Sequence, residues 1–382
     1  MIYVILLVAV GILAPDLYIW DNYVRGGRAI WSVIYWVPSL LFVVLAVFAL
    51  AFKRFSAGLM NIFTALILGV ALPKALFALV AWLGATSANL VSFAEPLGYY
   101  GGVTIALVVM TLSFFGLFFG WKIITVQRVE MRFDTLPPQF DGYKIVQLSD
   151  FHIGTYHKSP DTVRTIVDKV NSLGADAIAF TGDLVNLRPS EVDEFMPVLE
   201  RLKARDGVFS VLGNHDYCAY LKYPEPDGAT RAMHALCDRE RAMGWKLLMN
   251  QSELIRRGDD MIAMVGVENH GRPPFPARAN LRHALKGLPK GAFKVLLSHD
   301  PTHWRDEVLP DSDVELMLAG HTHAMQFRIG RFSPSRFVYR EWGGEYRVGD
   351  RVLYVSTGVG SNLTFRFGAW PEVVEITLRS GR

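Results

Sequence analysis

Five short motifs in the second half of the chain hold side chains that bind divalent metal ions. They supply carboxylate, carboxamide and imidazole groups, a ligand mix that suits Mn, Fe or Zn rather than Ca or a thiolate site. A pair of such ions can stabilise both the attacking and the leaving oxygen of an in-line displacement at phosphorus. The motifs therefore predict hydrolysis of a phosphate ester or a pyrophosphate. Their sequences are Asp150-Phe151-His152, Gly182-Asp183, Gly213-Asn214-His215-Asp216, Ser298-His299-Asp300 and Gly320-His321-Thr322-His323.

Seven residues of these motifs are candidate metal ligands. In an extended segment residues i and i+2 point to one face. We therefore expect Asp150 and His152 to reach one ion together, and His321 and His323 to do the same. A carboxylate such as that of Asp183 has two oxygens and can bridge two ions. The candidate ligands are Asp150, His152, Asp183, Asn214, His299, His321 and His323. We expect surface or capping roles for the other histidines, His157, His234, His270, His283 and His303.

Each motif follows a short apolar run, so strand ends should position the site. After about Val126, apolar runs alternate with amphipathic stretches, which is typical of an α/β domain in which ligands gather beyond the strand ends. The expected strands are Lys144–Leu148, Ala177–Phe180, Val208–Leu212, Met261–Val265, Lys294–Leu297, Glu315–Leu318 and Arg351–Val355. The expected helices are Asp161–Leu173, Glu191–Ala204, Thr230–Met243 and Thr302–Leu309.

The composition divides the chain into two parts. Of the 382 residues 51% are hydrophobic and 20% are charged, and residues 1–121 are nearly devoid of charge. The net charge of +3, without a Lys/Arg run or an RNA-binding signature, does not indicate a nucleic-acid partner. Two cysteines, Cys218 and Cys237, form no disulfide framework or zinc finger. We favour buried free thiols, with a single bridge between them as the alternative.

Residues 1–121 contain apolar stretches close to the roughly 20 residues that cross a bilayer. We expect an all-α bundle of about four transmembrane helices that begins with a retained anchor rather than a signal peptide. Residues 122–139 would be a linker or first strand, and residues 140–382 the catalytic domain. The expected spans are residues 2–19, 30–52, 57–83 and 101–121.

Charges in and beside these spans carry two further predictions. Lys74 should reach an interface or mark a kinked helix end, with a functional intramembrane charge as the alternative. With four spans both chain ends lie on one face, together with Lys53 and Arg54, whereas Arg25 and Arg28 lie opposite. The positive-inside rule therefore favours a cytoplasmic catalytic domain.

As an ordered set, the five motifs resemble those of the calcineurin-like metallophosphoesterases over roughly residues 140–378. The resemblance implies a four-layer αββα sandwich, with two mixed sheets between helices, and two divalent ions, for which Mn is the first choice and Fe or Zn the alternatives. It implies that the first ion is held by Asp150, His152, Asp183 and His323. It implies that the second ion is held by Asp183, Asn214, His299 and His321.

The resemblance also implies a mechanism. Two ions would lower the pKa of a bridging water, and the resulting hydroxide would attack phosphorus in line. His215, oriented by Asp216, would protonate the leaving oxygen. The chain departs from the family pattern at Asn186, where a second Asp is common, and at Ala324-Met325-Gln326, where glycines and Gln often follow the His-x-His block. The Asn186 position usually lies outside the metal ligands, so we expect an active enzyme.

The C-terminal part of the chain narrows the resemblance. Residues 354–360, with Arg366-Phe367-Gly368 and Pro371-Glu372, resemble a bacterial subgroup of membrane-attached and exported phosphodiesterases. That subgroup is similar to enzymes that cleave the pyrophosphate of UDP-2,3-diacylglucosamine in lipid A biosynthesis. The arrangement of several spans ahead of the domain resembles that of proteins named transmembrane protein with metallophosphoesterase domain. We therefore expect a lipid-linked substrate at a bacterial inner membrane, and leave the oligomeric state open.

Two alternatives remain. The substrate could be water-soluble, with the spans only as an anchor, or the chain could be a membrane sensor that binds metal or phosphate without turnover. His215 argues against a sensor, because binding alone needs no proton donor. Residues 217–228 and 327–346 could form the rim of the site, and the arginines and aromatic residues of the second segment suit a lipid headgroup at an interface. An ordinary two-stranded extension with solvated arginines is the alternative.

Overall fold

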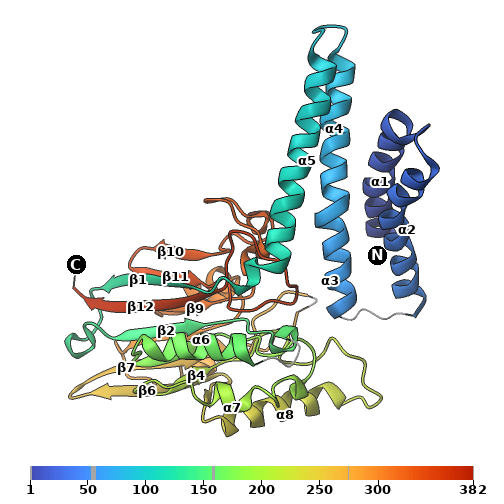
Figure 1. Ribbon diagram of the computed structural model, residues 1–382. Coiled ribbons are helices and arrows are strands. Elements are labelled where there is room, and N and C mark those ends of the chain that lie inside the picture. The colour runs from blue at the N-terminus through green and yellow to red at the C-terminus, as the bar shows by residue number, and fades with distance from the viewer. Residues whose placement is uncertain (1, 53–56, 157–159, 274, 382) are drawn as a thin grey trace. The chain divides into compact units, whose positions relative to one another are not determined.

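The computed structural model (Figure 1) describes residues 2–52, 57–156, 160–273 and 275–381, so His157 lies outside the described residues. The chain divides into two compact units. The helical unit comprises residues 1–120 and 363–367, and the α/β unit comprises residues 121–362 and 368–382. A short C-terminal segment thus belongs to the unit that the N-terminal residues build.

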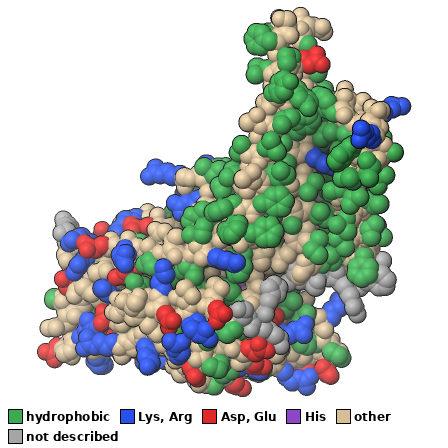
Figure 2. All heavy atoms as spheres, in the orientation of Figure 1, with side chains coloured by type: hydrophobic (Ala, Val, Ile, Leu, Met, Phe, Trp, Pro, Cys, Tyr) green, Lys and Arg blue, Asp and Glu red, His purple; other side chains and the backbone are tan. Residues whose placement is uncertain are grey.

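Long apolar helices build the helical unit, and hydrophobic side chains cover the face of it that Figure 2 shows. A π-helical turn, η2 (Ile67–Ala71), joins α3 to α4 just before Pro73, a residue that cannot donate a helical hydrogen bond. The helices are α1 (Ile2–Ile19), α2 (Ala29–Phe52), α3 (Ala57–Leu66), α4 (Leu72–Ser87) and α5 (Ala94–Phe118).

Three helical stretches among the described residues are long and apolar enough to cross a membrane: Ala29–Ala49, Gly58–Ser87 and Ala94–Lys122. They correspond to the second, third and fourth expected spans, although the last begins at Ala94 rather than at residue 101. Helix α1 covers the first expected span and is not one of the three. Three apolar spans and one further helix are roughly consistent with the expected bundle of about four.

A polar cluster lies inside the helical unit. The Asp16 carboxylate of α1 is fully buried and accepts hydrogen bonds from the Ser39 hydroxyl and, over 3.1 Å, from the Tyr35 hydroxyl of α2. The Lys74 ammonium of α4 lies 2.8 Å from Asp16 Oδ1 and 4.1 Å from the centre of the Tyr35 ring. The sequence suggested that Lys74 reaches an interface or marks a kinked helix end. It lies in the first turn of α4, just after the π-helical turn η2, and Asp16 compensates its charge inside the unit.

The α/β unit contains two six-stranded sheets. In the first sheet the strand order is β1 (Thr125–Phe133), β12 (Glu372–Ser380), β2 (Lys144–Leu148), β3 (Ala177–Phe180), β4 (Val208–Ser210) and β5 (Lys246–Leu247). In the second sheet the order is β10 (Gly344–Val348), β11 (Arg351–Val355), β9 (Leu316–Ala319), β8 (Phe293–Leu297), β7 (Asp260–Gly266) and β6 (Gln251–Arg257).

Both sheets are mixed, but within each sheet the strands that precede the motifs are parallel to one another. Strand β2 pairs in parallel with β3 and β3 with β4, while β12 runs antiparallel to β2. In the second sheet β7, β8, β9 and β11 are parallel, and β6 and β10 are antiparallel partners at its edges. Within each sheet, the carboxyl ends of the parallel strands therefore meet at one edge.

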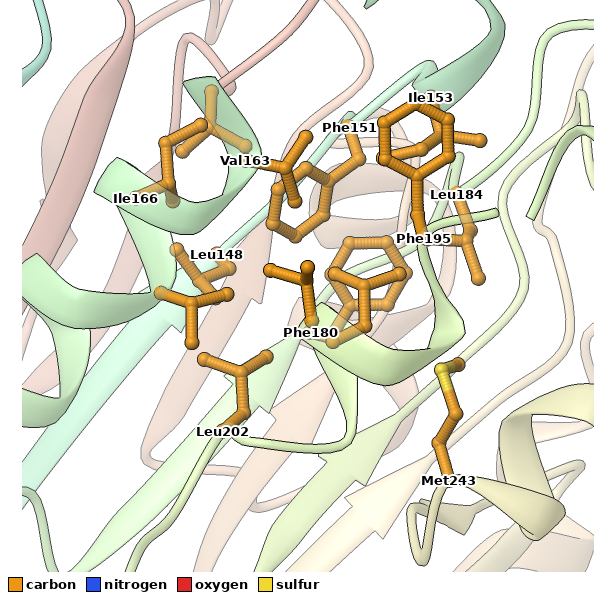
Figure 3. Packing of buried hydrophobic residues seen from close by; sticks show 14 of the residues in the cluster. Leu148, Phe151, Ile153, Val163, Ile166, Phe180, Leu184, Phe195, Leu202 and Met243 are labelled. Atoms are coloured by element: carbon orange, nitrogen blue, oxygen red, sulfur yellow. The ribbon is translucent and has the colours of Figure 1, made fainter. Parts of the chain in front are cut away.

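Clusters of buried hydrophobic side chains hold the α/β unit together. Val163 and Ile166 of α6 (Asp161–Ser172) pack over Leu148 and Phe180 of the first sheet (Figure 3). A second cluster fills the space between the sheets, and a third lies under η7 (Trp304–Val308) on the outer face of the second sheet. The remaining helices are α7 (Met196–Leu199), α8 (Gly228–Ala242), α9 (Leu281–Ala284) and α10 (Leu309–Asp311). This is the αββα sandwich that the resemblance implied.

The sequence located some strands closely and missed others. Lys144–Leu148, Ala177–Phe180 and Arg351–Val355 are strands with the expected bounds, whereas β6, β10 and β12 were not expected. The expected helix Glu191–Ala204 is wrong in extent: only the short α7 forms within it, and α7 begins at Met196 because Pro197 is tolerated only in the first turn of a helix. Both cysteines are buried free thiols, as favoured.

Candidate active site

The ends of five parallel strands position the candidate ligands. Strand β2 is followed by Asp150 and His152, β3 by Asp183, β4 by Asn214, β8 by His299, and β9 by His321 and His323. Six of these residues supply an imidazole or carboxylate, and all six lie in groups whose ligand atoms are within 4.8 Å of one another. The structure therefore brings together residues that are up to 173 positions apart in the chain (150 to 323).

The first donor group consists of Asp150, His152 and His323. The Nε2 atoms of His152 and His323 are 3.1 Å apart, and Asp150 Oδ1 lies 3.3 Å from His323 Nε2. Asp150 and His152 are fully buried. Three possible ligand atoms of this first group thus face one small volume.

The second donor group consists of Asp183, His299 and His321. His299 Nε2 lies 3.2 Å from Asp183 Oδ2, 3.3 Å from His321 Nδ1 and 3.2 Å from Asn214 Oδ1. The Asn214 carboxamide nitrogen donates to the Tyr220 hydroxyl over 2.7 Å, which leaves its oxygen directed at His299. Asn214 therefore adds a fourth ligand atom to this group.

Asp183 connects the two groups. Its Oδ2 atom lies 3.5 Å from His152 Nε2 in the first group and 3.2 Å from His299 Nε2 in the second. Its Oδ1 atom accepts the backbone N–H of His215 over 2.8 Å, which fixes the plane of the carboxylate. Asp183 therefore stands where a residue shared by two metal sites would be needed.

The backbone does not place these side chains as the sequence suggested. The expectation was an extended chain in which residues i and i+2 share a face. Instead, five of the seven candidate ligands have positive φ, which non-glycine residues rarely adopt and which costs free energy unless the surroundings enforce it. The residues are Asp150 (φ 55°), His152 (46°), Asp183 (60°), His321 (73°) and His323 (49°). These five ligands converge because the chain turns sharply after β2, β3 and β9.

Two glycines allow the loops to approach the carboxylates. A side-chain carbon at Gly213 would collide with the Asp183 carboxylate, and one at Gly320 would collide with Ser149 and with the Asp150 carboxylate. These positions therefore require glycine because of close contact, and not because of their φ angles.

The electrostatics of the site favour neutral imidazoles and bound positive charge. Burial lowers the pKa of His152 to about 3 and that of His321 to about 4. Burial also disfavours a charge on His299, yet Asp183 and Asp150 raise its pKa to about 10. The carboxylates thus attract a cation to the centre of the site. Neutral imidazole, carboxylate and carboxamide together fit divalent ions such as Mn, Fe or Zn.

His215 is oriented by a different residue from the one expected. Its Nδ1 atom lies 2.7 Å from the Asn186 carbonyl oxygen, and its Nε2 atom lies 3.1 Å from Asn362 Nδ2. The Asp216 carboxylate instead accepts the backbone N–H groups of four residues, Gly213, Asp183, Leu184 and Val185. Asp216 therefore fixes the loop that carries Asp183, and Asn186 and Asn362 hold the His215 ring.

Three residues at the site were not among the predicted metal ligands or catalytic residues. Tyr220 contacts Asn214, and the Tyr339 hydroxyl lies 2.9 Å from His321 Nε2. Both belong to the segments expected to form the rim. Asn362 had no signal in the sequence, because it lies 147 residues from His215 and in no motif.

A further histidine cluster lies outside the site. His303 is fully buried, not a surface or capping residue as expected, and its two ring nitrogens contact Ser298 Oγ and Glu307 Oε2, both over 2.9 Å. The His270 ring stacks on it with centroids 4.4 Å apart and planes inclined by 19°. Two nearly parallel, stacked rings cannot both direct a lone pair at one ion, so this cluster is a hydrogen-bonded one.

Known proteins are similar in sequence to this chain over the α/β unit. Residues 143–325 match the family described as calcineurin-like phosphoesterase. The chain is 31% identical over 259 residues to the uncharacterized metallophosphoesterase YkuE of Bacillus subtilis (strain 168), a match that covers 64% of this chain and 82% of that protein. It is 27% identical over 275 residues to phosphodiesterase YaeI of Escherichia coli (strain K12), covering 68% of this chain and 89% of that protein.

One similarity extends into the helical unit. Over 295 residues the chain is 28% identical to a transmembrane protein with metallophosphoesterase domain from Danio rerio, which covers 74% of this chain. The chain spans 64% of the length of that relative. Together with the three apolar spans, this similarity indicates association with a membrane. The chain therefore belongs to the calcineurin-like metallophosphoesterases and is a metal-dependent hydrolase.

Proposed function

We propose that this chain is a membrane-anchored phosphodiesterase or pyrophosphatase that works with two divalent ions. The observation that carries the proposal is the pair of donor groups joined at Asp183. Asp150, His152, Asp183 and His323 would hold one ion. Asp183, Asn214, His299 and His321 would hold the other. Mn is our first choice for both, with Fe or Zn as alternatives.

The ions and the protein have separate tasks in this proposal. Two divalent ions supply a lowered pKa for attacking water and compensation for the charge on the phosphate oxygens. His215 gives a proton to the departing oxygen from Nε2, while the Asn186 carbonyl fixes the ring through Nδ1. Asp216 keeps Asp183 in place through the backbone of its loop. Residues 140–382 would thus form the catalytic domain and residues 1–121 the membrane domain.

The proposed substrate is a lipid-linked phosphodiester or pyrophosphate, and UDP-2,3-diacylglucosamine is the first compound to test. The helices would hold the catalytic domain at a membrane, where a lipid substrate is locally concentrated. Tyr220 and Tyr339 connect the site to residues 217–228 and 327–346, and arginines of the second segment could pair with phosphate. A soluble substrate, or a sensor without turnover, is the alternative.

Hydrolysis by the full-length protein, loaded with Mn, tests the proposal. The substrates are bis-p-nitrophenyl phosphate and one nucleotide-sugar pyrophosphate in acylated and deacylated forms. We expect turnover of the aryl ester and a higher kcat/KM for the acylated pyrophosphate. Equal kcat/KM for the two forms would favour the soluble substrate. Intact metal loading with no hydrolysis of any of them would favour the sensor.

We further propose that the protein lies in a bacterial inner membrane with its catalytic domain in the cytoplasm. Lys53 and Arg54, and the basic residues after the last span, would share the cytoplasmic face if four helices cross. A reporter fused after Arg382 tests this placement. We expect fluorescence from a protein that folds only in the cytoplasm. Alkaline phosphatase activity at the same position, without fluorescence, would reverse the orientation.

A further inference from the structure

Exposed hydrophobic side chains of the α/β unit concentrate in one short segment. Among the described residues of this unit, seven large hydrophobic side chains are exposed, and two of them, Tyr220 and Val348, lie elsewhere. The other five are Met325 (43%), Ile329 (58%), Phe332 (40%), Phe337 (78%) and Val338 (63%). Soluble surfaces expose single hydrophobic residues freely, but a concentration of this kind marks a site of interaction.

The segment that carries them, residues 325–340, is held in a defined conformation. Ile329 and Phe332 exchange backbone hydrogen bonds of 2.9 and 3.0 Å across a turn. The Ser333 hydroxyl donates to the Ala324 carbonyl over 2.6 Å, and the short helix η9 (Pro334–Phe337) follows. The hydrophobic side chains are therefore exposed on a fixed backbone.

The same segment is strongly basic. It contains four arginines, all exposed, and no Asp or Glu: Arg328, Arg331, Arg336 and Arg340. The Arg336 guanidinium lies 6.0 Å from the centre of the Phe337 ring, so charge and aromatic surface alternate at close range. Amphipathic arginine and aromatic side chains together suit the boundary between lipid headgroups and acyl chains, and arginine is attracted to anionic lipid.

The segment is also connected to the active site. Its Tyr339 hydroxyl lies 2.9 Å from Nε2 of the candidate ligand His321. Thr322, between the two ligand histidines, donates to the Trp342 carbonyl just beyond the segment. A surface bound by residues 325–340 would therefore lie close to the candidate ligands His321 and His323.

We propose that residues 325–340 dock on the anionic lipid surface of a bilayer. A bilayer is the occupant we choose over a protein partner, because the apolar helices of the same chain require one and its anionic headgroups complement the four arginines. The docking does not depend on the proposed lipid-linked substrate. It would bring the ends of the β-strands, with the ligands His321 and His323, to the level of lipid phosphates.

Fluorescence from single positions of the full-length protein tests the docking. Cys218 and Cys237 are buried, so an environment-sensitive maleimide dye should label an introduced surface cysteine selectively, with the unsubstituted protein as the labelling control. The dye is placed at Phe337→Cys and, as the matched control in the same unit, at Val348→Cys. The protein is reconstituted in vesicles of phosphatidylcholine with phosphatidylglycerol, with or without bromine on the acyl chains.

We expect a blue-shifted emission at Phe337→Cys that brominated acyl chains quench, and neither effect at Val348→Cys. Equal emission at both positions without quenching would overturn the proposal. Quenching that depends instead on the amount of labelled protein per vesicle would identify a second copy of the chain as the occupant. A blue shift without bromine quenching would identify burial against protein. Either result also overturns it.

The charge of the segment is tested by Arg331→Gln, Arg336→Gln and Arg340→Gln combined. Each arginine near an anionic surface contributes about 1 kcal/mol, a factor of about five, so the docked fraction relative to the undocked one should fall roughly 100-fold. The loss should appear in vesicles with phosphatidylglycerol and be much smaller in phosphatidylcholine alone. An equal loss in both lipids would contradict a role for the anionic headgroups. Hydrolysis of bis-p-nitrophenyl phosphate, measured in parallel, reports on the proposed function separately.

Discussion

Each unit contains a buried carboxylate, and the two units compensate its negative charge in different ways. Asp16 in the helical unit is fully buried and has the Lys74 ammonium 2.8 Å away. Asp183 in the α/β unit is almost as buried, and its neighbours are the neutral or titratable nitrogens of His152 and His299. The first cluster contains its own cation, and the second offers several ligand atoms to a cation from outside.

The difference follows from the energetic cost of burying charge. An ion removed from water loses several kcal/mol of solvation unless a partner compensates it. In the helical unit a fixed lysine supplies the compensation, so the cluster is complete and can bind little else. In the α/β unit the compensation is left to a proton on His299 or to metal ions, which makes the second cluster a binding site.

Glu240 shows a third way in which a buried carboxyl group avoids an uncompensated charge. Glu240 of α8 is fully buried, and its Oε2 atom accepts a hydrogen bond of 2.6 Å from the Ser210 hydroxyl. Burial raises the pKa of Glu240 to about 8. This carboxyl group has neither an ammonium nor several imidazoles beside it, and it retains its proton instead.

The largest effect should come from Asp183→Asn, which removes charge from the residue shared by both donor groups. We expect both ions to bind more weakly and hydrolysis to be nearly abolished. Metal content by mass spectrometry, together with turnover of an aryl phosphodiester, measures both effects. Asp238→Asn, on the exposed face of α8, is the control for loss of one carboxylate. Two tightly bound ions and full turnover in Asp183→Asn would contradict the assignment.

His215→Ala should keep the metal ions and slow the reaction according to the leaving group. A general acid contributes on the order of 10²–10⁴-fold when the departing oxygen is basic, and much less for p-nitrophenol. The ratio of kcat for alkyl and p-nitrophenyl esters is the measurement. His234→Ala, an exposed histidine of α8, is the matched control. Equal losses for both esters would assign His215 another role.

Lys74→Met should destabilise the helical unit because it leaves Asp16 buried without a cation. Removing one partner of a buried ion pair costs about 3–5 kcal/mol, whereas replacing both often costs little. We therefore expect the double variant Asp16→Leu/Lys74→Met to regain most of the lost stability. Unfolding of the reconstituted protein by denaturant measures both, with the exposed Lys122→Met as control. A double variant as unstable as Lys74→Met would contradict the explanation that the unpaired charge of Asp16 causes the instability.

Glu240→Gln should leave the free energy of unfolding nearly unchanged at low pH, and its stabilising effect should grow as the pH rises. The folded-state pKa of about 8 lies above the ordinary value of 4.5, so the stabilisation is complete below about pH 4.5 and is lost as the pH rises through 8. Each pKa unit corresponds to about 1.4 kcal/mol. The variant should match the unsubstituted protein near pH 5 and exceed it above pH 8 in the free energy of unfolding.

The control for this comparison is the exposed Glu200→Gln, which should give the same pH dependence as the unsubstituted protein. A Glu240→Gln variant that loses stability with rising pH as steeply as the unsubstituted protein would contradict a protonated Glu240.

The sequence by itself determined the elements and the chemical groups of this protein. Short apolar runs that end in Asp, Asn or His predicted the strands β2, β3, β8 and β9 and the ligand types beyond them, because burial on both faces leaves a continuous hydrophobic signal. Long uncharged stretches predicted the apolar helices for the same reason. These features depend on neighbouring residues, which a single chain displays directly.

Only the tertiary structure decided which groups meet. Asp16 and Lys74 are 58 residues apart, and His215 and Asn362 are 147 apart, so neither pairing leaves a pattern in the local sequence. The left-handed turns at Asp150 and His321 likewise arise where the surrounding structure enforces a conformation that the residue alone disfavours. Contacts between distant residues decide how a buried charge is compensated, and therefore which of the two buried clusters remains free to bind metal.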